Sequence, residues 1–91
     1  MRVKQTNLFK KMIKKLPKQN KLIVDNEVRK IMQNPYIGEQ KKGDLNFLRV
    51  HKFKVSNQLY LLGYTYQEDI VTITLLKFSS HENFYRDLKR L

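Results

Sequence analysis

The chain has 91 residues, no cysteine and a formal net charge of +11, from 19 Lys and Arg against 8 Asp and Glu. This length supports one small core, so we expect a single domain over residues 1–91. The lack of cysteine excludes disulfides and fits a reducing cytoplasm. No apolar run approaches the roughly 20 residues of a membrane span. The positive charge favours nucleic acid as a partner and predicts that a protein partner is acidic.

The first third of the chain predicts two helices. Residues 1–5 are compatible with a short edge strand. Thr6 and Asn7 then form an N-cap signal for an apolar helical stripe that Pro17 ends. A second helical pattern runs over residues 18–33 and ends where Asn34 precedes a proline. The short link at Pro17 predicts that the two helices form an antiparallel hairpin.

The rest of the chain changes to a strand-like period after a polar loop over residues 36–46. We expect strands over 47–55, 58–66 and 70–78, the first two joined by a turn at Ser56 and Asn57, and a short helix starting at Ser79 or Ser80. The predicted fold class is α+β, in which the N-terminal helical hairpin packs on a small antiparallel β-sheet meander followed by the short C-terminal helix.

One irregularity lies in the first of these strands. Leu48 and Val50 are apolar, and the alternation then slips by one position before Phe53. This slip predicts a β-bulge at residues 51–52, which would gather the basic side chains of the strand on one side. The alternative is that Lys52 reaches solvent from the opposite face of a regular strand.

Candidate chemistry centres on the two histidines. His81 and Tyr85 are spaced i, i+4, which places them on one face of the expected C-terminal helix. His51 lies within a basic segment, residues 49–54, whose cations could hold a phosphate. Histidine exchanges protons near neutral pH, and two histidines without clustered carboxylates are too few for a zinc site. These residues therefore predict RNA cleavage without a metal or other cofactor.

Four short segments, taken in order and spacing, resemble the RelE/ParE superfamily of bacterial toxins from type II toxin–antitoxin modules: residues 41–43, 48–51, 59–64 and 80–85. In the RelE branch, members cleave messenger RNA on the ribosome, and the C-terminal pattern here is similar to the YafQ type. The resemblance implies a cytoplasmic endoribonuclease with an acidic cognate antitoxin, the ribosome and messenger RNA as partners. It implies the catalytic residues Arg49, His51, His81 and Tyr85 and the phosphate-binding lysines Lys41, Lys42, Lys52, Lys54 and Lys77.

The chain departs from the RelE pattern at Leu61. RelE-type nucleases usually read Tyr-Arg-x-x-Tyr in this strand, whereas residues 60–64 here read Tyr-Leu-Leu-Gly-Tyr. Either a lysine at 52, 54 or 77 substitutes for that arginine, or the site works differently, or activity is weaker. The leucine favours the ParE branch, which inhibits DNA gyrase without nuclease chemistry, whereas His51 and His81 favour the nucleases. A plain RNA-binding module is a third alternative.

Under the nuclease hypothesis, we expect the 2′-hydroxyl of RNA to attack the adjacent phosphate. His51 is then the expected base and His81 the expected acid, although the two roles could be exchanged. Arg49 and the lysines of its strand would stabilise the charged transition state. Phe84 is expected to pack in the core. The acidic pairs at 25 and 27 and at 68 and 69 are expected on the surface.

Overall fold

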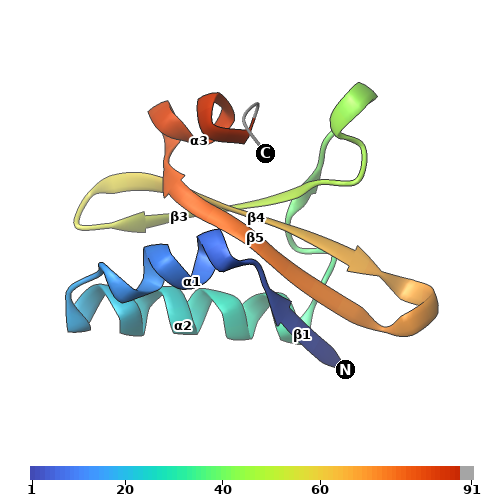
Figure 1. Ribbon diagram of the computed structural model, residues 1–91, viewed down its shortest axis with the longest axis horizontal. Coiled ribbons are helices and arrows are strands. Elements are labelled where there is room, and N and C mark those ends of the chain that lie inside the picture. The colour runs from blue at the N-terminus through green and yellow to red at the C-terminus, as the bar shows by residue number, and fades with distance from the viewer. Residues whose placement is uncertain (89–91) are drawn as a thin grey trace.

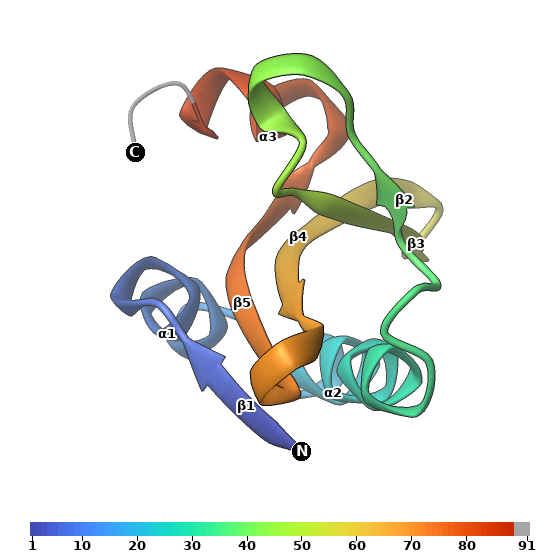
Figure 2. The same ribbon diagram turned by 90° about the vertical axis from the view of Figure 1, so that its right-hand side faces the viewer.

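A computed structural model describes residues 1–88, apart from the side chains of Tyr85, Asp87 and Leu88. Within this part, a five-stranded sheet of order β1-β5-β4-β3-β2 has helices on both faces (Figures 1 and 2). The elements in chain order are β1 (Arg2–Gln5), α1 (Asn7–Lys14), α2 (Lys18–Gln33), β2 (Glu39–Gln40), the single turn η1 (Gly43–Leu45), β3 (Arg49–Val55), β4 (Gln58–Gln67), the single turn η2 (Glu68–Ile70), β5 (Thr72–Ser80) and α3 (His81–Leu88). None of the described helices is long and apolar enough to cross a membrane.

The α+β class is confirmed, and the local signals explain the helix ends. The Thr6 hydroxyl accepts a hydrogen bond from the Phe9 amide at 3.1 Å and donates one to the Leu76 carbonyl, so the N-cap also fixes α1 to β5. The expectation of a purely antiparallel meander is wrong in one respect. β1 pairs with β5 in parallel, with Arg2 opposite Thr72. α1 continues onward from β1, and α2 then brings the chain back along the sheet (Figure 1).

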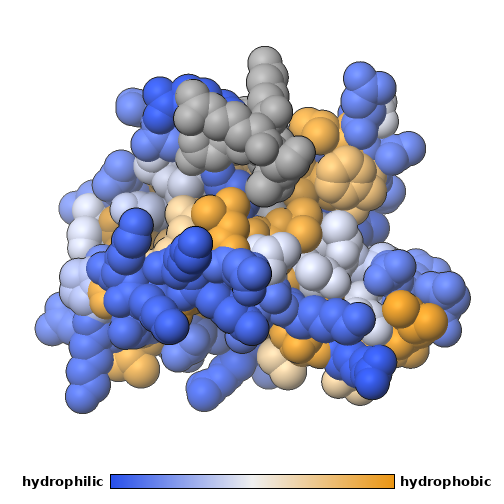
Figure 3. Space-filling model, in the orientation of Figure 1, coloured by the Kyte–Doolittle hydropathy of each residue, from blue (hydrophilic) through white to orange (hydrophobic). Residues whose placement is uncertain are grey.

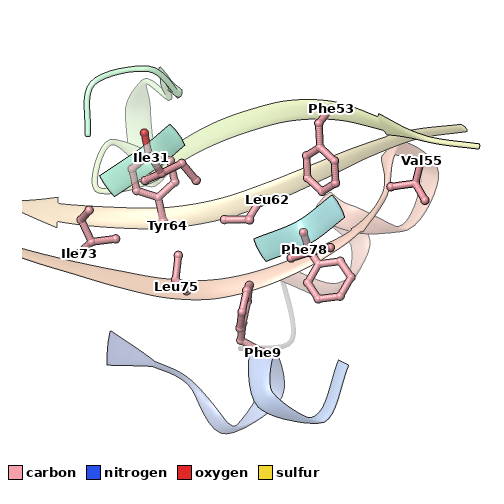
Figure 4. Packing of buried hydrophobic residues seen from close by; sticks show 10 residues of the cluster. Phe9, Ile31, Phe53, Val55, Leu62, Tyr64, Ile73, Leu75 and Phe78 are labelled. Atoms are coloured by element: carbon pink, nitrogen blue, oxygen red, sulfur yellow. The ribbon is translucent and has the colours of Figure 1, made fainter. Parts of the chain in front are cut away.

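One face of the sheet is covered by α1, which packs on β5, and by α2, which packs on β3. Figure 4 shows the apolar side chains that meet between the sheet and these helices. Phe9 and Phe78 pack edge to face, with ring centroids 5.5 Å apart. The buried members of this cluster, called here the helix-face core, are Phe9, Val24, Ile31, Phe53, Val55, Leu62, Tyr64, Ile73, Leu75 and Phe78.

The opposite face carries a smaller core beneath α3. Its buried residues, called here the α3-face core, are Leu48, Val50, Leu61 and Phe84. Gly63 makes this packing possible, since a Cβ at that position would lie 2.7 Å from the end of the Phe84 ring. Leu45 packs against the same core, which brings the loop before β3 beside α3 (Figure 2).

The two cores explain the slipped alternation in β3. The strand pairs with β4 without interruption from Arg49 opposite Tyr64 to Val55 opposite Gln58, so the predicted bulge at 51–52 is wrong. Val50 belongs to the α3-face core and Phe53 to the helix-face core, and a regular strand produces this pattern when its two ends are buried on different faces. The irregularity of the sheet lies between β4 and β5 instead, after Gly63.

Candidate nucleic-acid interface

Three exposed side chains on the α3 side of the sheet form the candidate site: Lys52, Lys54 and His81. Residues paired across strands share a face. Lys52 is opposite Leu61 of the α3-face core, and Lys54, two residues on, is therefore on the same side. Tyr60 is opposite Ser80, the residue before His81, and Leu59, which is opposite Lys54, lines a cavity together with His81. Lys54 and His81 therefore lie near the same end of β4.

The hairpin turn between β3 and β4 closes one side of this site. Ser56 and Asn57 both have positive φ, 51° and 68°, as a two-residue turn between twisted strands requires. A shallow cavity of about 340 Å³ lies between this turn and the start of α3, and its lining includes Asn57, Leu59 and His81. His81 is therefore open to a ligand that lies across the end of the hairpin.

Positive charge also lies elsewhere on the surface. Figure 3 shows a hydrophilic band over α1 on the opposite side of the molecule's core from α3, and its exposed lysines include Lys10, Lys11 and Lys14. Lys42 is exposed in the loop beside α3. Lys41 is partly covered and contacts Glu39 at 3.5 Å. The basic side chains are therefore spread over several elements and both faces, and together they attract a polyanion to the molecule.

His51 does not belong to this site, which corrects the prediction that the two histidines act together. It faces the helices, is 9% exposed, and lies 2.9 Å through Nε2 from Glu27 Oε1 of α2. The other oxygen of Glu27 contacts Lys30 Nζ at 2.9 Å. Burial by itself would raise the pKa of Glu27, but hydrogen bonds and charge from Lys30 and His51 outweigh it and lower that pKa.

Arg49 is also on the helix side of β3, and its guanidinium is already engaged. It donates to the Gly38 carbonyl at 2.9 Å and to Gln40 Oε1 at 3.4 Å, and it lies over the Tyr36 ring at 5.0 Å. These contacts hold the segment between α2 and β2 against β3. The expected role of Arg49 in binding the scissile phosphate therefore does not fit its position.

The structure shows where the Lys77 side chain lies but does not describe the side chain of Tyr85. Lys77 is fully buried beneath α3, where Nζ donates to the Phe84 carbonyl at 3.3 Å and lies 5.4 Å from the Phe84 ring. It supports α3 and is not exposed to RNA, which corrects its assignment as a phosphate ligand. The backbone of Tyr85 lies in α3, but its side chain is outside the described part of the chain.

Leu61 occupies the centre of the α3-face core and is fully buried. Its neighbours across the sheet are Lys52 on β3 and Ser79 on β5. Position 61, where RelE-type nucleases usually have an arginine, is therefore on the same side of the sheet as the candidate site. In this chain it is covered by α3 and filled by an apolar side chain, and Lys52 is the exposed cation in that row.

The sequence interpretation missed Glu27 and the aromatic residues Tyr36 and Tyr66. Glu27 was expected on the surface, yet it lies between Val24 and Ile31 on the buried face of α2. The helical spacing i, i+3, i+7 from Val24 contained that signal. The two tyrosines pack edge to face at 5.4 Å across 30 residues of sequence, which no local pattern reveals.

Residues 3–89 match the family model described as ParE-like toxin of type II bacterial toxin–antitoxin systems. The chain therefore belongs to this family of toxins. No curated protein sequence matches it.

Solved structures of the same fold include proteins of Mycobacterium tuberculosis and Escherichia coli. A chain of the Mycobacterium tuberculosis RelBE2 toxin–antitoxin complex is 17% identical with a TM-score of 0.75, and the match covers 88% of this chain and 96% of that one. The isolated Escherichia coli RelE toxin is 16% identical with a TM-score of 0.68, covering 98% and 96%. A chain of the intact Escherichia coli RelBE complex is 15% identical with a TM-score of 0.69, covering 86% and 93%.

Proposed function

We propose that this toxin is an endoribonuclease that cleaves translated messenger RNA on the ribosome. The observation that carries the proposal is the placement of Lys52, Lys54 and His81, which are exposed on the α3 side of the sheet, with His81 lining an open cavity. Two lysines can hold a phosphate diester, and the histidine adjoining them can exchange a proton with it. The net charge of +11 supports association with a ribosomal complex.

The chemistry that fits this arrangement is transfer of the phosphate to the neighbouring 2′-oxygen. The 2′-hydroxyl loses its proton to solvent and attacks phosphorus, the bond to the 5′-oxygen breaks, and His81 gives a proton to that leaving oxygen. The products are a 2′,3′-cyclic phosphate and a 5′-hydroxyl. Lys52 and Lys54 stabilise the negative charge that develops on the phosphate oxygens. His51 takes no part, because Glu27 holds it on the other face.

Inhibition of DNA gyrase is the second candidate function, and Leu61 is the observation that favours it. The apolar residue leaves the proposed nuclease site without the arginine of the RelE pattern, and it is part of a packed core. The family description names ParE-like toxins. In that case the lysines of β3 would bind a protein or DNA and His81 would be dispensable.

We also propose an acidic antitoxin as the partner of this chain. Two of the similar solved structures are toxin–antitoxin complexes. A strongly basic toxin surface attracts an acidic chain, and such attraction speeds association more than it slows dissociation. Covering Lys52 and Lys54 would neutralise the toxin by blocking its site.

Induction of the toxin in bacterial cells tests the proposal, with primer extension on a reporter message. Wild-type toxin should give codon-phased cuts, and none in the same message without its start codon. His81→Gln should reduce cleavage about 10²–10⁴-fold, and the double change Lys52→Gln with Lys54→Gln should reduce it to a similar extent. The matched control is Lys10→Gln with Lys14→Gln, which removes the same charge from exposed positions of α1.

Growth arrest with intact messages and a DNA-damage response would contradict the nuclease proposal and support gyrase. A folded His81→Gln variant that cleaves like wild type would remove His81 from the mechanism. Circular dichroism of each variant shows whether the fold is retained.

A further inference from the structure

A larger cavity, of about 710 Å³, lies at the opposite end of the sheet from His81. It is bounded by the loop before β3, by the end of β4 and by η2. Thr65 and Gln67 belong to its lining, whereas Leu59 of the same strand lines the cavity at His81. Six to eight residues of strand separate the two, so they lie about 20–25 Å apart. The mechanism proposed above makes no use of this cavity.

Exposed aromatic rings distinguish the cavity from the rest of the surface. Tyr36 and Phe47 both line it and are 50% and 54% exposed. Figure 3 shows hydrophobic surface at this end of the molecule, over the loop before β3 and the turn between β4 and β5. Within the described residues, Phe47 packs against no other ring. Aromatic faces open to solvent beside a cavity are suited to stack on a flat ligand.

The Tyr36 ring is held in place before any ligand arrives. Tyr36 packs edge to face on Tyr66, Arg49 covers the Tyr36 ring, and the Tyr36 hydroxyl donates to the Glu68 carboxylate. That hydrogen bond raises the pKa of Tyr36 to about 12, so the hydroxyl stays protonated at physiological pH. A preformed aromatic surface loses little conformational entropy on binding.

The polar lining supplies both hydrogen-bond acceptors and donors. Asp69 offers a carboxylate that has no hydrogen bond or ion pair within the described part of the chain, and Asn46 and Gln67 offer side-chain amides. Guanine is the base whose Watson–Crick edge carries two adjacent donors, N1–H and N2–H, which one carboxylate can accept together. Its O6 and N7 accept from amide donors.

We propose that this cavity binds an unpaired guanine base of RNA, stacked on Phe47 and recognised at its Watson–Crick edge by Asp69. The sugar and phosphates would remain outside, because Glu68 and Asp69 repel anions and the Arg49 guanidinium is engaged with Gly38 and Gln40. Unpaired bases are the usual targets of sequence-specific RNA recognition. The same two carboxylates disfavour an acidic protein segment as the occupant.

The inference rests on the proposed function only in taking RNA as the target. It adds a second, non-cleaving contact that would favour certain RNA sequences or ribosomal positions. Base binding and cleavage are measured separately, so either can fail without the other.

Amide shifts in ¹H–¹⁵N spectra of the full-length protein test the proposal, during titration with the four nucleoside 5′-monophosphates. Guanosine monophosphate should shift the amides of Phe47, Gln67 and Asp69 and bind about tenfold more tightly than the adenosine compound. A uridine pentamer with one central guanine should shift the same amides at lower concentration, because its additional phosphates are attracted by the strongly basic chain. This arm separates guanine within RNA from a free nucleotide.

Two exposed positions provide variants that keep the fold. Asp69→Asn should abolish the preference for guanine, and Phe47→Ala should weaken binding of all bases about tenfold. Glu82→Gln, an exposed acid beside His81, is the matched control and should bind guanosine monophosphate like wild type.

Three results would overturn the proposal. These are equal affinity for all four nucleotides, amide shifts confined to the lysines of α1 and β3, and an unchanged guanine preference in Asp69→Asn. Shifts at Phe47 and Asp69 that occur only with the antitoxin would also overturn it and identify a protein-docking surface.

Discussion

Each face of the sheet has a histidine beside its core, but the two histidines differ in how far they are buried. On the helix face, His51 is sealed against Glu27 beneath α2, and it sits at the edge of a ten-residue core. On the α3 face, a core of four buried residues leaves His81 and two strand lysines exposed. The extent of covering therefore decides which histidine is open to a ligand, and the larger core lies on the face without the proposed cleavage site.

Leu61→Arg is the strongest test of the smaller core. Placing a charge at this fully buried position without a partner should lower the free energy of unfolding by about 3–5 kcal/mol. Urea denaturation measures the change. Leu61→Met is the matched control, because it nearly conserves volume and should cost less than about 1.5 kcal/mol.

The opposite result would be informative for the site. If Leu61→Arg stays as stable as wild type and cleaves RNA faster, then α3 moves aside in the active toxin and this row of the sheet accepts the arginine of the RelE pattern. Our placement of Leu61 in a permanent core would then be wrong.

Glu27→Gln tests the polar contact on the larger face. Removing the charge that His51 and Lys30 share should cost about 1–3 kcal/mol at neutral pH. Because the pKa of Glu27 is lowered on folding from 4.5, its ionised form stabilises the fold above that pH, and this contribution is lost as the pH falls through the lower folded value. The difference between variant and wild type should therefore shrink in acid.

Unfolding measured at pH 7 and at pH 3 checks this dependence. Asp25→Asn, on the exposed side of the same helix, should show neither effect. A difference that grows in acid would mean that Glu27 is not held ionised by its neighbours. Toxicity of a folded Glu27→Gln variant should match wild type, since this face carries no site.

Gly63→Ala should have the smallest effect of the three. The added methyl group would lie 2.7 Å from the tip of the Phe84 ring, and a slight tilt of α3 should limit the cost to about 1 kcal/mol. Combining it with Phe84→Leu, which removes the contacted atom, should recover part of the loss in a double-mutant cycle. Additive losses would show that the ring and the strand do not meet.

Much of the fold follows from local signals, and much of the site does not. Thr6, Pro17 and Pro35 set the helix ends that the structure shows, and the turn at 56–57 was readable from its residues. The side of the sheet to which a β3 residue points depends on how two cores divide the strand. A sequence pattern shows both cores superimposed, which is why His51 and Arg49 were assigned to the wrong face.

The edge of β3 has a further consequence. β2 pairs with it only at Arg49 and Val50, so within the described residues no strand covers its outer side from Lys52 onward. In an antiparallel ladder the peptide groups alternate in direction, and since Val50 faces β2, those of Lys52 and Lys54 point outward. An open edge of this kind invites pairing with the edge of another molecule, and lysine side chains on it oppose that by mutual repulsion. The proposed RNA-binding lysines thus also protect the free toxin against aggregation. A variant that has lost its toxicity because these lysines were replaced should therefore be less soluble than its parent.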